Sequence, residues 1–172
     1  MQSRWLMSWR RAALAALVLV AACDRHSEDE ARALAEHWFD IGETLHFASQ
    51  RHCTAAVFRA QSGEVKSRVP LFASAEAVIG SGAQAGAFAI STPDSSVDVL
   101  FLALMNADRP TGLALRETGL AARPCMTEAT RQAFHSALTV SPSVLVYSAP
   151  DGAFAVLDPV RRHVVLTSGA IQ

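Results

Sequence analysis

The sequence predicts an α+β fold, in which a long N-terminal helix and further helices pack on a small antiparallel sheet. Three observations lead to this prediction. Apolar residues recur at helical spacing after Ser27, a turn signal at residues 61–64 is flanked by strand-like segments, and three short apolar runs separated by turns occupy residues 143–167. A chain of 172 residues suffices for one domain, and packing helices on one face of an antiparallel sheet buries the apolar surfaces of both.

The first helix is expected over residues 27–50. Ser27 is the N-cap of a capping box and Glu30 its partner, so that each side chain accepts a hydrogen bond from the other residue's backbone N–H. Apolar residues then follow at alternating steps of three and four: Ala31, Leu34, Trp38, Ile41, Leu45 and Ala48. This spacing predicts one buried face on a helix about 35 Å long.

A β-hairpin is expected next, with strands at residues 53–58 and 65–69, and Pro70 ends it. Residues 74–89 contain three glycines and favour neither helix nor strand. The remaining expected elements are helices at residues 93–106, 110–124 and 127–138, and then the strands of a C-terminal meander at residues 143–148, 153–157 and 163–167.

The composition is that of a globular protein, with 51% hydrophobic and 18% charged residues. Three of the 15 basic residues precede Cys23, and none of the 16 acidic residues does. The segment that begins at Cys23 therefore carries a net charge of about −4. It contains no basic cluster that could grip a phosphate backbone, so the sequence argues against nucleic-acid binding.

The first 22 residues have the pattern of a secretory signal. Arg4, Arg10 and Arg11 form a basic region without acids, and residues 12–22 form an apolar run. A membrane-spanning helix needs about 20 apolar residues, and here it would have to bury two arginines. We therefore predict a signal peptide at residues 1–22.

The end of this signal carries a resemblance to a known class of protein. Val20-Ala21-Ala22-Cys23 resembles the lipobox of bacterial lipoproteins: an aliphatic residue, two small residues and a cysteine. The resemblance implies that the Cys23 thiol receives a diacylglyceryl group and that the chain is cut before it. Residues 23–27 would then be the lipid anchor and a short tether, and residues 28–172 a single α+β envelope domain. An ordinary signal peptide, cut at an Ala-x-Ala-like site, is the alternative.

The lipobox also implies a location and a partner. A protein acylated at Cys23 is held by the lipid bilayer and, once exported, faces the periplasm of the bacterial envelope. In enteric bacteria an aspartate at the next position, here Asp24, resembles a signal to stay in the inner membrane. Other bacterial groups follow different rules, so the inner and the outer membrane both stay open.

Two cysteines, Cys53 and Cys125, remain after the anchor. An even pair in an oxidising compartment predicts a disulfide, which would close a loop of about 70 residues. Two separate buried thiols are the alternative. There is no Cys-x-x-Cys, so neither a thioredoxin-like site nor haem attachment is indicated.

No motif predicts a metal site or a cofactor. On the expected helix His37 and His46 lie on opposite faces, and His37 and His52 would be about 22 Å apart. His-x-x-x-His is absent. The glycines of residues 80–86 resemble a phosphate-binding loop only loosely, and a turn or a helix end is the ordinary interpretation.

No motif predicts a catalytic residue either. Glu36, Asp40 and Glu43 would stack on the solvated face of the first helix, away from the apolar stripe. Gly-x-Ser-x-Gly and Ser-x-x-Lys are both absent. We therefore expect a non-catalytic accessory protein that binds or supports an unknown envelope protein. A hydrolase that places His135 or His163 beside a serine or aspartate, and a small-ligand carrier with a closed apolar cavity, are the alternatives.

Overall fold

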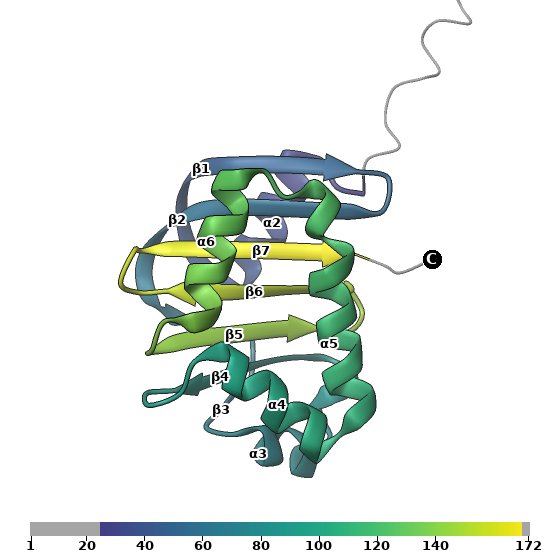
Figure 1. Ribbon diagram of the computed structural model, residues 1–172. Helices are drawn as coiled ribbons and strands as arrows, with labels where there is room; N and C mark the ends of the chain where they lie inside the picture. The colour runs from purple at the N-terminus through teal and green to yellow at the C-terminus, as the bar shows by residue number, and fades with distance from the viewer. Residues whose placement is uncertain (1–24, 170–172) are drawn as a thin grey trace, which may run out of the picture.

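The computed structural model describes residues 25–169, which form an α+β domain around a seven-stranded sheet (Figure 1). The strand order is β1-β2-β7-β6-β5-β4-β3, and all neighbours are antiparallel except β3 and β4. The strands are β1 (Phe39–Gln50), β2 (Cys53–Val65), β3 (Leu71–Phe72), β4 (Ala87–Thr92), β5 (Ser143–Ser148), β6 (Ala153–Asp158) and β7 (His163–Gly169). The predicted fold class is confirmed, but the sheet is larger than the small sheet expected.

Five α-helices and two short 3₁₀ helices lie within the described residues. They are α2 (Glu28–Trp38), α3 (Ala75–Ser81), η1 (Ala83–Ala85), α4 (Val97–Ala107), α5 (Arg109–Ala121), η2 (Arg123–Cys125) and α6 (Glu128–Thr139). None of the helices described in residues 25–169 combines the length and the apolar character needed to cross a membrane. The predicted signal peptide, Cys23 and Asp24 lie outside the described residues.

Helix α2 begins where the capping box predicts. The Ser27 hydroxyl accepts a hydrogen bond from the Glu30 N–H at 3.2 Å, and a Glu30 carboxylate oxygen accepts one from the Ser27 N–H at 2.7 Å. Ala31, Ala35 and Trp38 are buried against the sheet. The cap and the apolar face together define the start and the orientation of this helix.

The predicted continuation of the helix to residue 50 is wrong, because the chain turns into strand β1 after Trp38. The register of β1 against β2 shifts at three places between Phe39 and His46, and each shift interrupts the twofold alternation of a strand. Apolar residues spaced by three or four can therefore arise on an irregular strand. Ile41 packs into the core on the α2 face of the sheet, and Leu45 packs against the core on the other face.

The predicted hairpin is also placed differently. The turn lies at residues 51–52, between β1 and β2, and β2 runs through the expected turn at residues 61–64 as far as Val65. Strand β2 pairs with β1 on one side and with β7 on the other. This second pairing joins the N-terminal hairpin to the predicted C-terminal meander of β5, β6 and β7, and makes one sheet of both.

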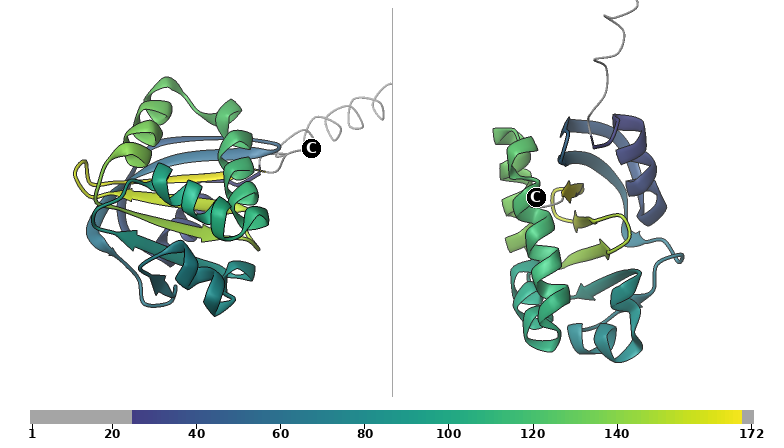
Figure 2. Two further views of the ribbon diagram at one scale, coloured as in Figure 1. Left: turned by 60° about the horizontal axis from the view of Figure 1, so that its bottom comes forward. Right: turned by 90° about the vertical axis from the view of Figure 1, so that its right-hand side faces the viewer.

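The central strands are buried on both faces. In β6, Ala153, Ala155 and Leu157 belong to the core under α2, whereas Phe154 and Val156 belong to the core under α4, α5 and α6. Figure 2 shows the sheet between α2 on one side and the α5–α6 layer on the other. The sequence of the meander therefore consists of apolar runs rather than of alternating apolar and polar residues, as is typical of strands covered on both faces.

Helices α4 and α5 approach each other closely at Gly112. A Cβ placed on this glycine would lie 2.6 Å from the Met105 Cα and 2.7 Å from the Met105 backbone nitrogen. The contact is with backbone atoms, which cannot rotate away. Glycine at this position thus sets the spacing of two of the three helices that cover this face of the sheet.

The predicted disulfide is present. Cys53 at the start of β2 is bonded to Cys125 of η2, with an S–S distance of 2.03 Å and a Cα–Cα distance of 5.9 Å. Both cysteines are buried with Ala55, Ala122 and Met126 in a third, small apolar cluster. The bond thus ties the α5–α6 connection to the edge region of the sheet.

Replacing both cysteines, as Cys53→Ala with Cys125→Ala, should lower the free energy of unfolding. The closed loop spans 72 positions, for which the chain-entropy model gives a loss of about 4 kcal/mol. Urea denaturation of the oxidised wild type and the double variant measures the difference. A loss below about 1 kcal/mol would mean that native-state strain cancels the entropic gain.

Gly112→Ala should destabilise the protein by about 1–3 kcal/mol, because the added methyl group overlaps the Met105 backbone. Gly80→Ala is the matched control. This glycine lies in helix α3 with no atom within 4 Å of an added Cβ, so the change should stabilise by up to about 1 kcal/mol. Thermal unfolding of the two variants tests the contrast, and equal effects would contradict it.

Candidate functional site

An apolar groove crosses the layer of helices α4, α5 and α6, which Figure 1 shows on the same face of the sheet. We call it the helical groove. It has a volume of about 390 Å³. Its apolar lining consists of Phe101, Gly119, Leu120, Met126, Phe134 and Leu138, and its other lining residues are Asp98, Arg116, Arg123, Arg131 and His135. A concavity of this size and composition is typical of ligand-binding sites.

The floor of the helical groove is supported from below by the sheet. The rings of Phe101 and Phe134 each lie 5.8 Å from the ring of Phe154 in β6, centroid to centroid. A Cβ on Gly119 would lie 3.2 Å from Cε1 of Phe154, so glycine is what lets this aromatic ring reach the level of α5. Three packed rings make a floor that offers dispersion contacts and no hydrogen-bond partner.

The rim of the groove is predominantly cationic. Arg131 forms an ion pair with Glu128 at 2.7 Å. Arg116 and Arg123 have no ion-pair partner among residues 25–169. Asp98 is the acidic residue in the described lining of the helical groove. Guanidinium groups at the edge of an apolar floor suit an anionic group, because their planar fork matches carboxylate and phosphate oxygens.

A second hollow adjoins the helical groove along α4. It has a volume of about 450 Å³, shares Asp98, Phe101 and Arg116 with the groove and adds Leu102 and Met105 of α4. Leu102 is 64% exposed, and Leu120 on the other side is 44% exposed. Large apolar side chains that stay in contact with water along one concavity indicate a surface that another molecule covers.

One end of the helical groove lies where the chain enters the domain. Arg123 and Met126 of the groove flank the disulfide, and Gln50 Nε2 donates to the carbonyl oxygen of Pro124 at 3.3 Å. The Arg25 N–H in turn donates to the carbonyl oxygen of Gln50 at 2.9 Å. The first described residue and the α5–α6 connection therefore meet at the same end of the molecule.

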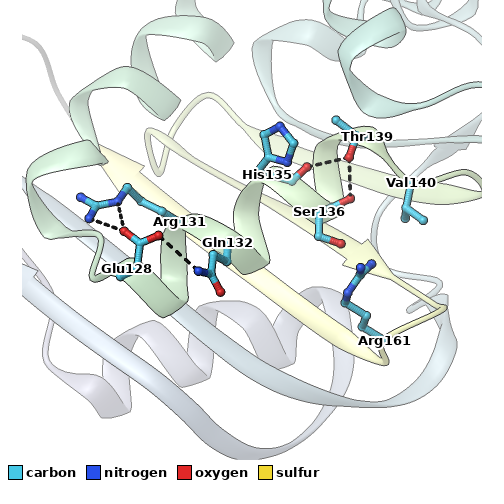
Figure 3. A pocket seen from close by; sticks show the side chains of 8 residues that line it. All are labelled: Glu128, Arg131, Gln132, His135, Ser136, Thr139, Val140 and Arg161. Atoms are coloured by element: carbon cyan, nitrogen blue, oxygen red, sulfur yellow. Dashed lines mark hydrogen bonds and ion pairs between the residues drawn. The ribbon is translucent and has the colours of Figure 1, made fainter.

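A polar pocket of about 620 Å³ lies along α6, beside the turn between β6 and β7 (Figure 3). Its polar groups mostly satisfy one another: Glu128 accepts from Arg131 and from Gln132, and the Thr139 hydroxyl donates to the His135 carbonyl oxygen. The imidazole of His135 points away from Ser136 (Figure 3). This pocket thus presents ion pairs and helix-bonded hydroxyls, without a serine–histidine pair.

The hydrolase alternative required a histidine beside a serine or aspartate. His163 and Ser136 do line one hollow of about 360 Å³, together with His46. The Ser136 hydroxyl, however, donates to Asp158 Oδ2 at 3.1 Å, and no hydrogen bond joins it to a histidine within residues 25–169. No serine–histidine hydrogen bond of the kind that activates a hydroxyl is therefore present among these residues, although His163 is paired with Asp158 across β6 and β7.

Asp158 itself has a structural task. It is 1% exposed, and its Oδ1 accepts from the backbone N–H groups of Val160 and Arg161 at 3.0 Å each. Its Oδ2 lies 3.3 Å from Nη1 of Arg161. These contacts close the β6–β7 turn, where Arg162 takes a positive φ of 56°. The Asp158 carboxylate is thus held by the turn and by the Ser136 hydroxyl of α6.

His163 is the most unusual titratable group in this region. Its Nδ1 is buried and has no hydrogen-bond partner in the described part of the chain. Burial lowers the pKa of this imidazole below 6.5, and although Asp158 opposes the shift, Arg59, Arg161 and His46 add to it. The ring therefore stays neutral in the folded protein at pH values where an exposed histidine begins to charge.

The other residues singled out in the sequence are engaged in structure. Glu36 pairs with Arg32, Asp40 with Lys66 and Glu43 with Arg59, at 3.1, 3.1 and 2.6 Å. Only Glu36 lies on a helix, because Asp40 and Glu43 belong to β1. Gly82, with φ of 75°, ends α3, which agrees with the ordinary interpretation of the glycine-rich segment. Among residues 25–169 no group of three His, Cys, Asp or Glu side chains could hold a metal ion.

The helical groove was not predicted from the sequence. Helix α4 buries Val97, Leu100 and Leu104, and Phe101 packs against the same core while it also lines the groove. The available signal was the density of apolar residues on α4, where Val99 and Leu102 interrupt the polar face that a one-sided helix should have. Comparison with known proteins adds nothing to this picture: no protein-family model, no curated protein and no solved structure matches the chain.

The burial of His163 predicts a pH dependence of stability. Between its folded pKa and 6.5 the unfolded chain binds a proton that the folded chain does not, so the free energy of unfolding should fall as pH drops below about 6.5. The pKa of His26 is lowered as well, mainly by burial, and acts in the same direction.

His163→Gln should remove part of this loss, whereas His37→Gln, on the exposed surface of α2, should leave it unchanged. Urea midpoints measured between about pH 7.5 and pH 5 give the comparison. A wild-type midpoint that rises on acidification, or identical slopes in both variants, would refute the assignment to His163.

Proposed function

We propose that the protein is a non-catalytic, lipid-anchored binding protein of the bacterial envelope. In this proposal the chain is acylated at Cys23, faces the periplasm and binds a partner at the membrane surface through the helical groove. The single observation that carries the binding role is the groove itself: an apolar floor with exposed leucines and unpaired arginines at its edge. It is more apolar than the polar pockets on either side of α6.

The attachment of the first described residues supports an anchor at Cys23. Arg25 Nε donates to the Ser168 hydroxyl at 2.5 Å, and the His26 N–H donates to the Ser49 hydroxyl at 3.2 Å. Cys23 precedes Arg25 by two residues, which span at most about 7 Å. A lipid on Cys23 would thus hold this end of the domain directly against the membrane, rather than on a long tether.

The charge at this end of the domain is mixed. Arg51 and Arg123 are exposed on the β1–β2 turn and on η2, and Glu28, Asp29 and Glu30 are exposed in the first turn of α2. Near an anionic leaflet each such arginine contributes about 1 kcal/mol of attraction, which the three acids oppose. The proposed orientation therefore rests on the anchor and not on charge.

The absence of a catalytic constellation in the described pockets favours binding over catalysis. The carboxylates and hydroxyls of the two polar pockets are committed to ion pairs, turns and helix carbonyl groups. The guanidinium groups of the groove never lose their proton in proteins and so cannot serve as bases, and no serine or cysteine joins Asp98 and His135 in its described lining. A surface of this kind is suited to binding and orienting a ligand.

The mass of the intact protein, taken non-reduced from the membrane fraction of its own host, tests the anchor. We expect the mass of residues 23–172 plus a diacylglyceryl group, less two hydrogens for the disulfide. Cys23→Ser should move the protein out of the membrane fraction or leave its signal uncut. An unlipidated mass with a different N-terminus would overturn the anchor, and the membrane-facing orientation would go with it.

A further inference from the structure

We propose that the helical groove binds a single acyl chain that carries an anionic head group, taken from the adjoining membrane. The inference rests on the proposed function only for the source of the ligand. The groove and its charges are features of residues 25–169 and do not depend on the anchor. The ligand class is therefore testable whether or not Cys23 is acylated.

The floor determines what can enter. Phe101 and Phe134, packed against the buried Phe154, offer no hydrogen-bonding group, so any polar atom placed there would lose its hydration without compensation. A hydrocarbon chain has no such atoms and gains about 0.8 kcal/mol for each methylene removed from water. The part of the ligand that lies on the floor is therefore hydrocarbon.

The shape of the groove makes that hydrocarbon elongated. The second hollow continues from the first through Phe101 and ends at Leu102 and Met105 of α4. Leu120 flanks the first hollow and Leu102 the second, and both are largely exposed. A flexible acyl chain can follow both hollows in succession and cover both leucines, whereas a compact ring system would fill only one of them.

The charges determine the head group. Arg123 and Arg131 line the end of the groove next to the disulfide, and Arg116 lies where the two hollows meet. Arg116 and Arg123 have no ion-pair partner within residues 25–169, and Asp98 is the acidic side chain that lines the groove with them. An excess of guanidinium groups selects a phosphate or carboxylate over a zwitterionic or cationic head.

The position of the groove indicates that its ligand comes from the membrane. Its arginine-bearing end is joined to the start of the domain through Pro124, Gln50 and Arg25. When Cys23 is anchored, this end lies at the membrane surface, where anionic lipids are at hand. The head group then sits at Arg123, beside the Arg131–Glu128 ion pair, and the chain runs across the floor toward Leu102 and Met105.

The test uses the chain with Cys23→Ser, exported behind a cleavable signal. Both cores, the disulfide and the capped first helix lie within residues 25–169, so this protein keeps every contact described above. Myristoyl lysophosphatidylglycerol is titrated in below its micelle concentration, and binding is followed by amide chemical shifts. Myristoyl lysophosphatidylcholine, with the same chain and no net charge, is the matched ligand.

We expect the shifts to gather on α4, α5 and α6, and the anionic lipid to bind about tenfold more tightly than the zwitterionic one. Arg123→Gln with Arg131→Gln should bring that ratio to about one while the thermal midpoint stays unchanged. Arg68→Gln, at an exposed arginine between β2 and β3 that lines neither hollow, should leave the ratio as it is. Leu102→Asn should weaken both lipids equally, because it touches only the tail.

Equal affinity for the two lipids in the wild type, or shifts confined to other elements, would overturn the proposal. The proposal would also be overturned, in favour of a protein partner, if neither lipid binds and a synthetic amphipathic helix binds tightly. That helix would carry a leucine stripe flanked by glutamates. Lipid binding by a protein that proves unlipidated in its host would instead leave the groove assignment standing and remove the anchor. The two proposals therefore fail in distinguishable ways.

Discussion

Two-sided burial of the sheet is the constraint from which the rest of this structure follows. All six residues of β6 are buried, and the side chains of the first five alternate between two cores. A strand of this kind needs a cover on each face. Helix α2 supplies one cover, and α4, α5 and α6 supply the other. The groove is the place where these three helices leave the aromatic rings beneath them partly uncovered.

The sequence predicted those parts of the fold that depend on local interactions. The capping box places the start of α2, and Thr127 caps α6, where its hydroxyl accepts from the Thr130 N–H at 3.2 Å. The meander follows from turn residues between apolar runs, and the disulfide from parity in an oxidising compartment. Each of these inferences uses residues close in sequence, or a count that is independent of geometry.

What the sequence did not predict depends on tertiary pairing. The segment of β1 has an apolar pattern that suits a helix, and only the long partner strand β2 makes it extended. The site is harder still, because its lining comes from α4, α5, η2 and α6, and its depth from Gly119 above Phe154 in β6. An apolar helical residue such as Phe101 is predicted from the sequence to be a core residue. Whether a neighbouring helix covers it depends on the angles at which the three helices pack.

The Cys53–Cys125 bond also divides the chain topologically. It encloses all of β2, the segment from β3 to β4 and both α4 and α5 in one covalent loop, and leaves α6 and the meander outside it. A single peptide-bond cut anywhere inside this loop produces two fragments that remain covalently linked, each still paired into the same sheet. Two of the helices that line the groove, α4 and α5, thus lie inside the closed loop, and α6 lies outside it. A protease that cuts an exposed connection near α3 would therefore leave the two fragments joined by the disulfide.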